Sequence, residues 1–150
     1  MTSGSKGLVI YKGKLLLVLR DNKSDIPWPN TWEYIGGGKE LGESFEETGL
    51  REIEEEFGIR PKNYTFLGIE NYPGRQAGRF IAILSDEEFQ NIHFGNEGVK
   101  FNWFTLEEAT KLEMAPNLKK FLEINKKPLI DIIENSRPIK KTDFIFTNES

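Results

Sequence analysis

Apolar residues in the first part of the chain come in short runs separated by turn-forming residues. Two of these runs, Gly7 to Tyr11 and Leu15 to Leu19, flank Lys12-Gly13-Lys14, which predicts a β-hairpin. The second run is apolar throughout, so we expect this strand to be buried on both faces of a sheet. A loop rich in charges and prolines follows over residues 20–30, and a short strand is predicted over 31–35, directly before three consecutive glycines.

The pattern changes to a helical period over residues 44–57. Its apolar stripe recurs every four residues, at Phe45, Gly49, Ile53 and Phe57. Ser44, with Glu47 three residues later, forms a capping-box pattern, and Gly58 is placed to end the helix in a left-handed conformation. Glycine inside a helix costs about 1 kcal/mol relative to alanine. We therefore expect Gly49 to mark close packing of this helix against the sheet.

The rest of the chain alternates between strand and helix patterns. Strands are predicted over residues 64–70, 79–84 and 99–104, with breaks at Tyr72-Pro73-Gly74 and Gly78. Helical segments are predicted over residues 86–90, 106–112, 116–124 and 129–134, and residues 143–147 suit either an edge strand or a disordered end. This order predicts an α/β fold with a mixed sheet between helices. We expect residues 1–126 to form one domain, with residues 127–150 as a helix and tail packed on it.

Composition narrows the classes of function. The chain has 150 residues, a net charge of −4 and no cysteine, which excludes disulfides, thiolate chemistry and Cys-ligated zinc. The acidic balance argues against a general nucleic-acid surface, so an anionic substrate has to be attracted locally by metal ions or a few cations. We see no signal-peptide core and no apolar run near the roughly 20 residues that span a bilayer, so we expect a cytoplasmic protein without a membrane partner.

Glutamates are concentrated on the predicted helix. Glu52, Glu55 and Glu56 are three or four residues apart and therefore project from one face. Three neighbouring carboxylates repel one another, and a hard divalent cation such as Mg²⁺, with Mn²⁺ as the alternative, would compensate them. A glutamate-rich helix taken alone is more often a solvent-exposed surface, and we expect this of Glu54.

The spacing around these glutamates carries more information than their number. The segment GGKELGESFEETGLREIEEEFGI, residues 37–59, resembles the signature of the MutT/Nudix hydrolase family at every fixed position. The resemblance implies a Nudix-type α/β/α sandwich. It implies that metal is held by Glu52, Glu55, Glu56 and the backbone carbonyl of Gly36, with Glu52 either a ligand or a residue that positions or deprotonates water. Structural roles are implied for Gly37, Glu43, Arg51 and Gly58, with Arg51 expected to pair with a carboxylate and hold the loop against the helix.

The general base is left open by the sequence. Members of the family use either a glutamate of the signature or one from a loop downstream. Glu97, in the segment Phe94-Gly95-Asn96-Glu97-Gly98, is the best downstream candidate, with an exposed loop charge as the alternative. Glu87 and Glu88 are weaker candidates, and the only histidine, His93, is better explained as an incidental polar residue than as a contact to phosphate or base.

Substrate recognition is expected from aromatic and basic residues outside the signature. Trp28, Trp32, Tyr72 and Phe94 lie in or beside predicted loops, where they could stack on a ring, whereas Phe101 and Trp103 are better core residues. Arginine suits bidentate phosphate contacts, and the candidates are Arg20, Arg75 and Arg79. We select Arg20, Trp28 and Arg79 as substrate-binding residues, although each taken alone is more often a surface side chain.

These observations predict a Mg²⁺-dependent pyrophosphohydrolase that cleaves a nucleoside diphosphate linked to another moiety. The first expected substrate is a nucleoside triphosphate, oxidised ones included, converted to the monophosphate and pyrophosphate. ADP-ribose and nucleotide sugars are the alternatives. Pro73 lies near the place of a proline in ADP-ribose hydrolases of the family but does not match it cleanly.

A nucleotide-binding Nudix module without turnover is the alternative from another class. Such modules usually lack some of the glutamates that this chain retains at positions 52, 55 and 56. The expected partner is a small nucleotide-type molecule rather than polymeric nucleic acid. A homodimer is compatible with the family, but no interface is recognisable in the sequence, which also leaves open the number of metal ions and the bond that is cleaved.

Overall fold

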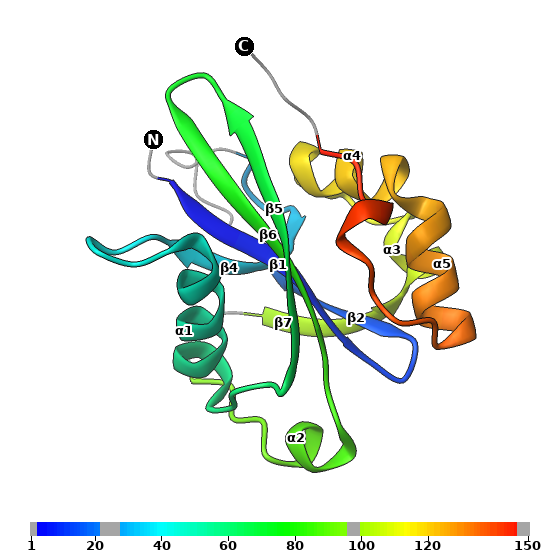
Figure 1. Ribbon diagram of the computed structural model, residues 1–150. Coiled ribbons are helices and arrows are strands. Elements are labelled where there is room, and N and C mark those ends of the chain that lie inside the picture. Colours follow the sequence, from blue (N-terminus) through cyan, green and yellow to red (C-terminus); the bar gives the residue numbers. More distant parts are fainter. Residues whose placement is uncertain (1–2, 22–27, 96–99, 147–150) are drawn as a thin grey trace.

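The computed structural model describes residues 3–21, 28–95 and 100–146, and a mixed sheet forms the centre of this part of the chain (Figure 1). Its strands are β1 (Gly4–Tyr11), β2 (Lys14–Leu19), β3 (Trp32–Glu33), β4 (Ile35–Gly38), β5 (Asn63–Tyr72), β6 (Arg75–Ile83) and β7 (Lys100–Thr105). The helices are α1 (Phe45–Phe57), α2 (Asp86–Gln90), α3 (Leu106–Ala109), α4 (Pro116–Ile124) and α5 (Lys126–Asn135), followed by a 3₁₀ turn η1 (Lys141–Asp143).

Strand β1 organises the sheet. It forms the predicted hairpin with β2 and pairs in parallel with β6. Where β1 and β2 diverge, β4 pairs with the first half of β1 and β3 pairs with the end of β2. Strand β7 pairs antiparallel with β2, and β5 pairs antiparallel with β6. The predicted mixed sheet is thus confirmed.

Helices cover both faces of this sheet, as the expected α/β/α sandwich requires. Helix α1 lies on one face, and α3, α4 and α5 lie on the other (Figure 1). Strand β2 contributes to both resulting core layers, because Leu16 faces α1 while Leu15 and Leu17 face the opposite helices. All three are fully buried, which confirms the expectation drawn from the unbroken apolar run.

Helix α1 forms as its sequence predicts. The Ser44 hydroxyl accepts a hydrogen bond from the backbone N–H of Glu47, and the Glu47 carboxylate accepts one from the backbone N–H of Ser44. At the other end, Gly58 has φ of 70° and donates its N–H to the carbonyl of Glu54. Both ends of the helix that carries the glutamates are therefore capped locally.

Gly49 is where α1 approaches the sheet most tightly. A Cβ added there would lie 2.2 Å from Tyr64 Oη and 2.8 Å from Phe80 Cδ2. Glycine-to-alanine replacement usually stabilises a helix by about 1 kcal/mol, but overpacking costs about 1–3 kcal/mol. We expect Gly49→Ala to lower the free energy of unfolding by about 1 kcal/mol, measured by urea denaturation. The exposed Glu54→Ala is the control, and an unchanged or raised urea midpoint for Gly49→Ala would contradict the prediction.

Several predicted boundaries are corrected by the structure. Gly78 does not break the chain but lies inside β6, where a Cβ would be 2.4 Å from the Ser5 hydroxyl, so this glycine serves close packing. The short strand predicted up to Ile35 continues through the three glycines that follow, as β4. Helix α5 begins earlier than predicted because Pro128 falls in its first turn, where a missing N–H costs no hydrogen bond.

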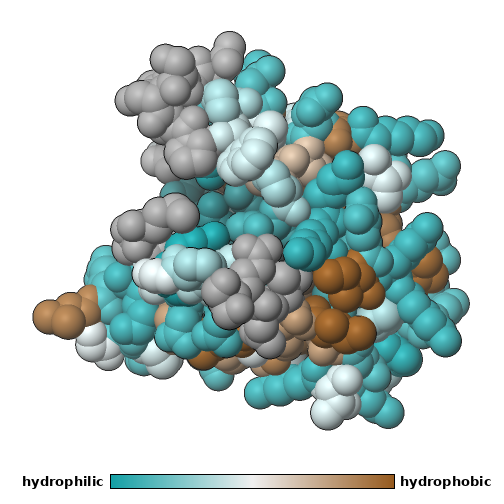
Figure 2. Space-filling view, turned by 90° about the horizontal axis from the view of Figure 1, so that it is seen from above, coloured by the Kyte–Doolittle hydropathy of each residue, from teal (hydrophilic) through white to brown (hydrophobic). Residues whose placement is uncertain are grey.

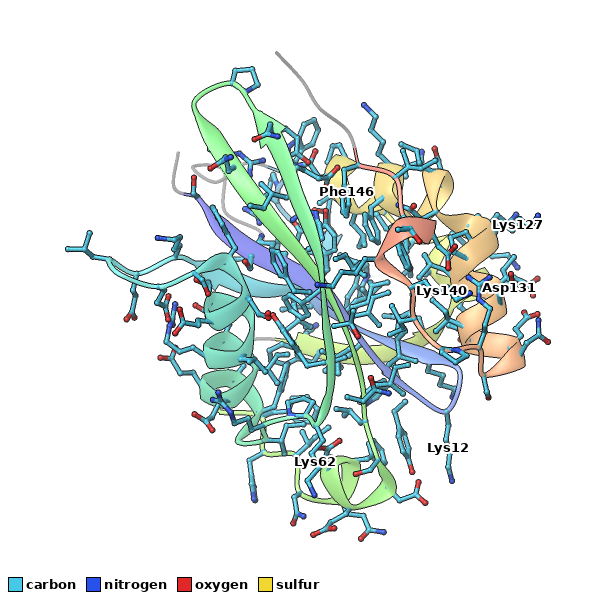
Figure 3. The ribbon with its side chains drawn as sticks, in the orientation of Figure 1. Lys12, Lys62, Lys127, Asp131, Lys140 and Phe146 are labelled. Atoms are coloured by element: carbon cyan, nitrogen blue, oxygen red, sulfur yellow. The ribbon has the colours of Figure 1, made fainter. Side chains whose placement is uncertain are left out.

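The segment after α5 is held against the core, and its described part, residues 143–146, forms neither the edge strand nor the disordered end offered as alternatives. Asn125 is fully buried, accepts the N–H of Ile145 at 2.7 Å and donates to the carbonyl of Ile145 at 3.0 Å. Phe144 joins the buried cluster under α4 and α5, and Phe146 packs over Gly68 of β5 (Figure 3). Helix α3 is also shorter than predicted and ends at Ala109, while Thr147 lies outside the described residues.

Candidate functional site

Arg51 connects the glutamates of α1 to the glycine-rich strand β4. Its Nε donates to Glu43 Oε2 at 2.6 Å, and Nη2 donates to the carbonyl of Gly38 at 2.8 Å. Its Nη1 lies 3.2 Å from Glu52 Oε1 and 3.1 Å from Glu55 Oε2. One guanidinium therefore fixes the end of β4, the loop that follows it and two of the signature glutamates relative to one another.

Glu43 anchors this network from the loop. Besides Arg51, its carboxylate accepts the backbone N–H of Glu40 at 2.9 Å and the hydroxyl of Thr48 at 3.0 Å. These hydrogen bonds, of which the one from Arg51 contributes most, lower the pKa of Glu43 from 4.5 to about 2. The carboxylate is therefore ionised in the folded chain throughout the neutral range.

A pH dependence of stability follows from Glu43. Because its pKa is lower in the folded than in the unfolded chain, the carboxylate stabilises the fold above about pH 4.5, and this contribution is lost as the pH falls towards 2. We expect Glu43→Gln to be less stable than the parent at pH 7 and to lose less further stability between pH 4.5 and 2. Thermal unfolding across this range tests it, with Glu54→Gln as the control. Parallel acid dependence in the parent and Glu43→Gln would contradict the prediction.

The Glu52 side chain is much less exposed than that of Glu55. Its side chain is 14% exposed, whereas that of Glu55 is 56% exposed. Burial raises the pKa of Glu52, the charge of Arg51 opposes this effect, and Glu55 and Glu56 add to it. The carboxylate lies so close to Gly37 that a Cβ there would be 2.4 Å from Glu52 Oε1, so a side chain at position 37 would displace the Glu52 carboxylate.

The donor set suits a hard divalent cation, because three carboxylates and a backbone carbonyl offer only oxygen ligands. Within the described ranges, no three acidic or histidine side chains converge at metal-binding distances in this conformation. Arg51 Nη1 instead contacts Glu52 and Glu55. The sequence resemblance predicts that Glu52, Glu55, Glu56 and the Gly36 carbonyl would hold the ion, and the chemistry of these donors fits Mg²⁺ or Mn²⁺.

A cavity of about 500 Å³ adjoins the glycines of β4. Gly36, Gly37 and Gly38 line it, and Glu52 lies against Gly37. Gly37 of β4 therefore borders both the cavity and the carboxylate of Glu52 on α1. Hydrophilic residues cover most of the surface at the end of the molecule shown in Figure 2.

Basic residues dominate the wall of this cavity. Its charged lining consists of Lys6, Arg20, Arg75, Arg79 and one acid, Glu33. Arg79 is 2% exposed, donates to Glu70 at 2.6 Å and places its guanidinium 4.5 Å from the centre of the Tyr34 ring. Arg75 stacks on Tyr72 at 4.2 Å. The excess of positive charge suits an anionic ligand.

The structure brings the three substrate-binding candidates together around one cavity. Arg20, Trp28 and Arg79 all line it, and Trp28 is 59% exposed. Arg79 is buried, so it is not the surface side chain that the sequence analysis gave as the alternative. Of the other aromatic candidates, Tyr72 contacts Arg75 and Arg79 of the cavity wall, whereas Trp32 packs edge-on against Phe104 at 4.9 Å and Phe94 contacts Phe57 at 5.7 Å.

The remaining candidates have structural contacts or cannot be placed. Glu88 caps α2 through Ser85 and accepts the N–H of Lys62. His93 donates its backbone N–H to Phe57 and lies beside Gly58 at the end of α1. Glu97 lies outside the described residues, so its role as a general base stays a prediction.

Sequence reasoning missed four polar side chains of the cavity wall, Lys6, Glu33, Tyr34 and Asn117. Two of them carried a recognisable signal. Lys6 interrupts an otherwise uncharged strand, and Glu33 stands between two aromatic residues in another. Asn117 gave no such signal, because its place at the cavity depends on how α4 packs against the sheet.

The family follows from the comparison with known proteins. The family model of the NUDIX domain matches residues 4–123, which is most of the chain. The chain therefore belongs to the Nudix family. No helix among the described residues is long and apolar enough to cross a membrane.

The relatives with similar sequences are named for different enzymatic activities. The chain is 32% identical to an ADP-ribose pyrophosphatase of Methanocaldococcus jannaschii over 109 residues, which cover 71% of this chain and 63% of the relative. It is 31% identical to the 8-oxo-dGTP diphosphatase of Escherichia coli over 102 residues, covering 67% of this chain and 77% of that protein. The chain thus spans less than two thirds of the archaeal relative.

Solved structures support the fold. The NUDIX domain of Shewanella oneidensis NrtR, solved in complex with ADP ribose, matches with a TM-score of 0.65 at 20% identity, covering 86% of this chain and 88% of that one. A mutT/nudix family protein from Listeria innocua also matches with a TM-score of 0.65, at 22% identity, covering 90% of this chain and 93% of that one.

Proposed function

We propose that this protein is a Mg²⁺-dependent hydrolase that converts a nucleoside triphosphate, oxidised ones included, to the monophosphate and pyrophosphate. One observation carries the proposal: Gly37 of β4 lines the cation-lined cavity and also lies against the carboxylate of Glu52 on α1. A nucleotide with its base in the cavity would carry its phosphates past this glycine to the carboxylates.

The residues have separable tasks in this reaction. A metal ion held by Glu52, Glu55 and Glu56 would neutralise phosphate charge and lower the pKa of water. Arg51 and Glu43 hold the end of β4 and the loop after it against α1. These contacts keep the carboxylates of α1 in a fixed position relative to the cavity. Water adds to one phosphorus while the anhydride P–O bond breaks, so pyrophosphate leaves. The proton of the water passes to a carboxylate, for which Glu52, with its raised pKa, is the candidate among the described residues.

ADP-ribose is the second candidate substrate, and nucleotide sugars follow it. The archaeal relative is named for ADP-ribose, and the cavity is lined by several cations that suit a second phosphate. A binding module without turnover is the third possibility, and the retention of Glu52, Glu55 and Glu56 disfavours it.

The test is a panel assay for phosphate or pyrophosphate release with Mg²⁺. The panel contains nucleoside triphosphates, oxidised nucleotides, ADP-ribose, nucleotide sugars and dinucleoside polyphosphates. Turnover of triphosphates that Glu55→Gln and Glu56→Gln abolish would support the proposal. Turnover of ADP-ribose or a nucleotide sugar alone would replace the substrate, and Mg²⁺-dependent binding without any turnover would favour the binding module.

A further inference from the structure

The end of the described chain, residues 143–146, runs alongside α4 and α5 and packs against residues that support the cavity wall (Figure 1). Phe144 is 7% exposed and stacks on Phe121 of α4, with the ring centres 6.3 Å apart. Phe121 in turn lies 6.1 Å from the ring of Tyr34, which lines the cavity. Phe144 therefore reaches a cavity-lining side chain through one intervening ring.

A second contact from this segment reaches the neighbourhood of Arg79. Phe146 packs over Gly68 of β5, where an added Cβ would lie 2.9 Å from Phe146 Cε2 (Figure 3). Gly68 is the cross-strand partner of Arg79 in β6. Side chains of directly opposite residues point to the same face of a sheet, with Cβ atoms about 5 Å apart. The Phe146 ring therefore fills the space beside Arg79 that a side chain at position 68 would occupy.

Both contacts act on the same pair of cavity-lining side chains. The guanidinium of Arg79 lies 4.5 Å from the centre of the Tyr34 ring, and its Nε donates to Glu70 at 2.6 Å. The Tyr34 hydroxyl is buried and has no hydrogen-bond partner among the described residues, so packing alone orients this ring. Since Arg79 is only 2% exposed, the groups packed around it determine which way its guanidinium points.

One anchor holds both aromatic residues of the segment. The side chain of Asn125 accepts the N–H of Ile145 at 2.7 Å and donates to its carbonyl at 3.0 Å. Ile145 lies between Phe144 and Phe146 in the chain, so the two ring contacts form or are lost together.

We propose that Phe144 and Phe146 are positioning residues, which hold Tyr34 and Arg79 in the orientation that binds the substrate. The inference rests on the proposed function as far as the substrate is concerned. It concerns binding rather than bond cleavage, because the glutamates that would hold the metal project from α1, on the opposite face of the sheet (Figure 1). Docking of the C-terminal segment therefore sets the affinity of the cavity.

Hydrogen exchange of the Arg79 Nε–H, followed by NMR, tests this role without any substrate. A proton donated to a buried carboxylate exchanges with solvent only when the pair opens, and local opening is distinguished from global unfolding by comparison with other protons. In Phe146→Ala we expect the Arg79 proton to exchange about 10-fold faster relative to the backbone amides of β1. The β1 amides report the stability of the whole sheet.

The second readout is steady-state kinetics with the triphosphate that the panel assay identifies. In Phe146→Ala we expect KM to rise about 10-fold while kcat stays within about twofold of the parent value, as for a change that affects substrate binding alone. A merely structural role would reduce the amount of folded enzyme, which lowers the apparent kcat and leaves KM unchanged.

Phe89→Ala is the matched control. Phe89 is a partly buried aromatic residue that stacks on Tyr11 at 4.1 Å, and it does not line the cavity. Its replacement should leave the relative exchange of Arg79 and KM within about twofold of the parent values. Phe144→Leu is a second test, which keeps an apolar side chain at the buried position and should change both readouts in the same direction as Phe146→Ala.

The inference is overturned if the relative exchange of Arg79 is unchanged in folded Phe146→Ala, or if Phe89→Ala accelerates it equally. A KM that stays at the parent value in Phe146→Ala also overturns it. Failure of the proposed reaction looks different, since no triphosphate would be hydrolysed. Faster exchange of Arg79 in Phe146→Ala, without a change in Phe89→Ala, would then still support the positioning role.

Discussion

Replacing Glu56 by glutamine is expected to reduce kcat by about 10³-fold, which corresponds to about 4 kcal/mol of transition-state stabilisation. The substitution keeps the size of the side chain but removes one charge from the carboxylates that would hold the metal. Glu55→Gln should act in the same direction. The measurement is steady-state pyrophosphate release at saturating Mg²⁺, accompanied by calorimetric titration with Mg²⁺, because activity and metal affinity should fall together.

Glu54→Gln is the control that makes this result specific. Glu54 lies on the same helix, has a 55% exposed side chain and contacts Arg60 only at 4.0 Å. Its replacement removes the same charge and should leave kcat and Mg²⁺ affinity within about twofold of the parent values. The thermal midpoint of Glu56→Gln should equal or exceed that of the parent, since repulsion among carboxylates is reduced. Equal activity of Glu54→Gln and Glu56→Gln would refute the assigned role of Glu56.

The largest effect on stability is expected from Arg79→Met. Arg79 and Glu70 are 2% and 3% exposed, and their closest approach is 2.6 Å. Methionine fills part of the space but leaves the Glu70 carboxylate buried without its guanidinium partner. Breaking one half of a buried ion pair costs about 3–5 kcal/mol, and we expect a loss of this size in urea denaturation at pH 7.

A double substitution tests this explanation. In Glu70→Met together with Arg79→Met, no charge remains unpaired, so much of the lost stability should return. The double variant should therefore be more stable than Arg79→Met alone. If it is less stable by the sum of the two single effects, the cost of Arg79→Met comes from lost packing against Tyr34 rather than from an unpaired charge.

The sequence predicted the elements whose determinants are local. The α1 helix is specified by Ser44, Glu47 and Gly58, which cap it through hydrogen bonds between neighbours in the chain. The β1–β2 hairpin depends on Lys12 and Gly13, both with positive φ. These elements could be located because no distant residue is needed to form them. The grouping of glutamates on one face of α1 follows for the same reason.

The cavity could be predicted only in part, because its wall joins residues from distant segments. Arg79 was selected as a basic residue, but its burial depends on Glu70 across the β5–β6 hairpin. Lys6 and Glu33 become neighbours only when β1 and β3–β4 pair within one sheet. The predicted ends of strands were wrong where a tertiary contact overrides a local preference, as at Gly78, which lies opposite Ser5.

The hydrogen bonds between Asn125 and Ile145 also affect how the chain folds during its synthesis. Phe144 completes the cluster beneath α4 and α5, and the Asn125 side chain bonds Ile145, twenty residues further along the chain, as well as nearby Phe121. During synthesis the sheet and α1 leave the ribosome before residues 144–146 do. The α4–α5 side of the core therefore stays incomplete, with apolar surface exposed, until residues 144–146 emerge, and during this interval the nascent chain is open to chaperones and proteases.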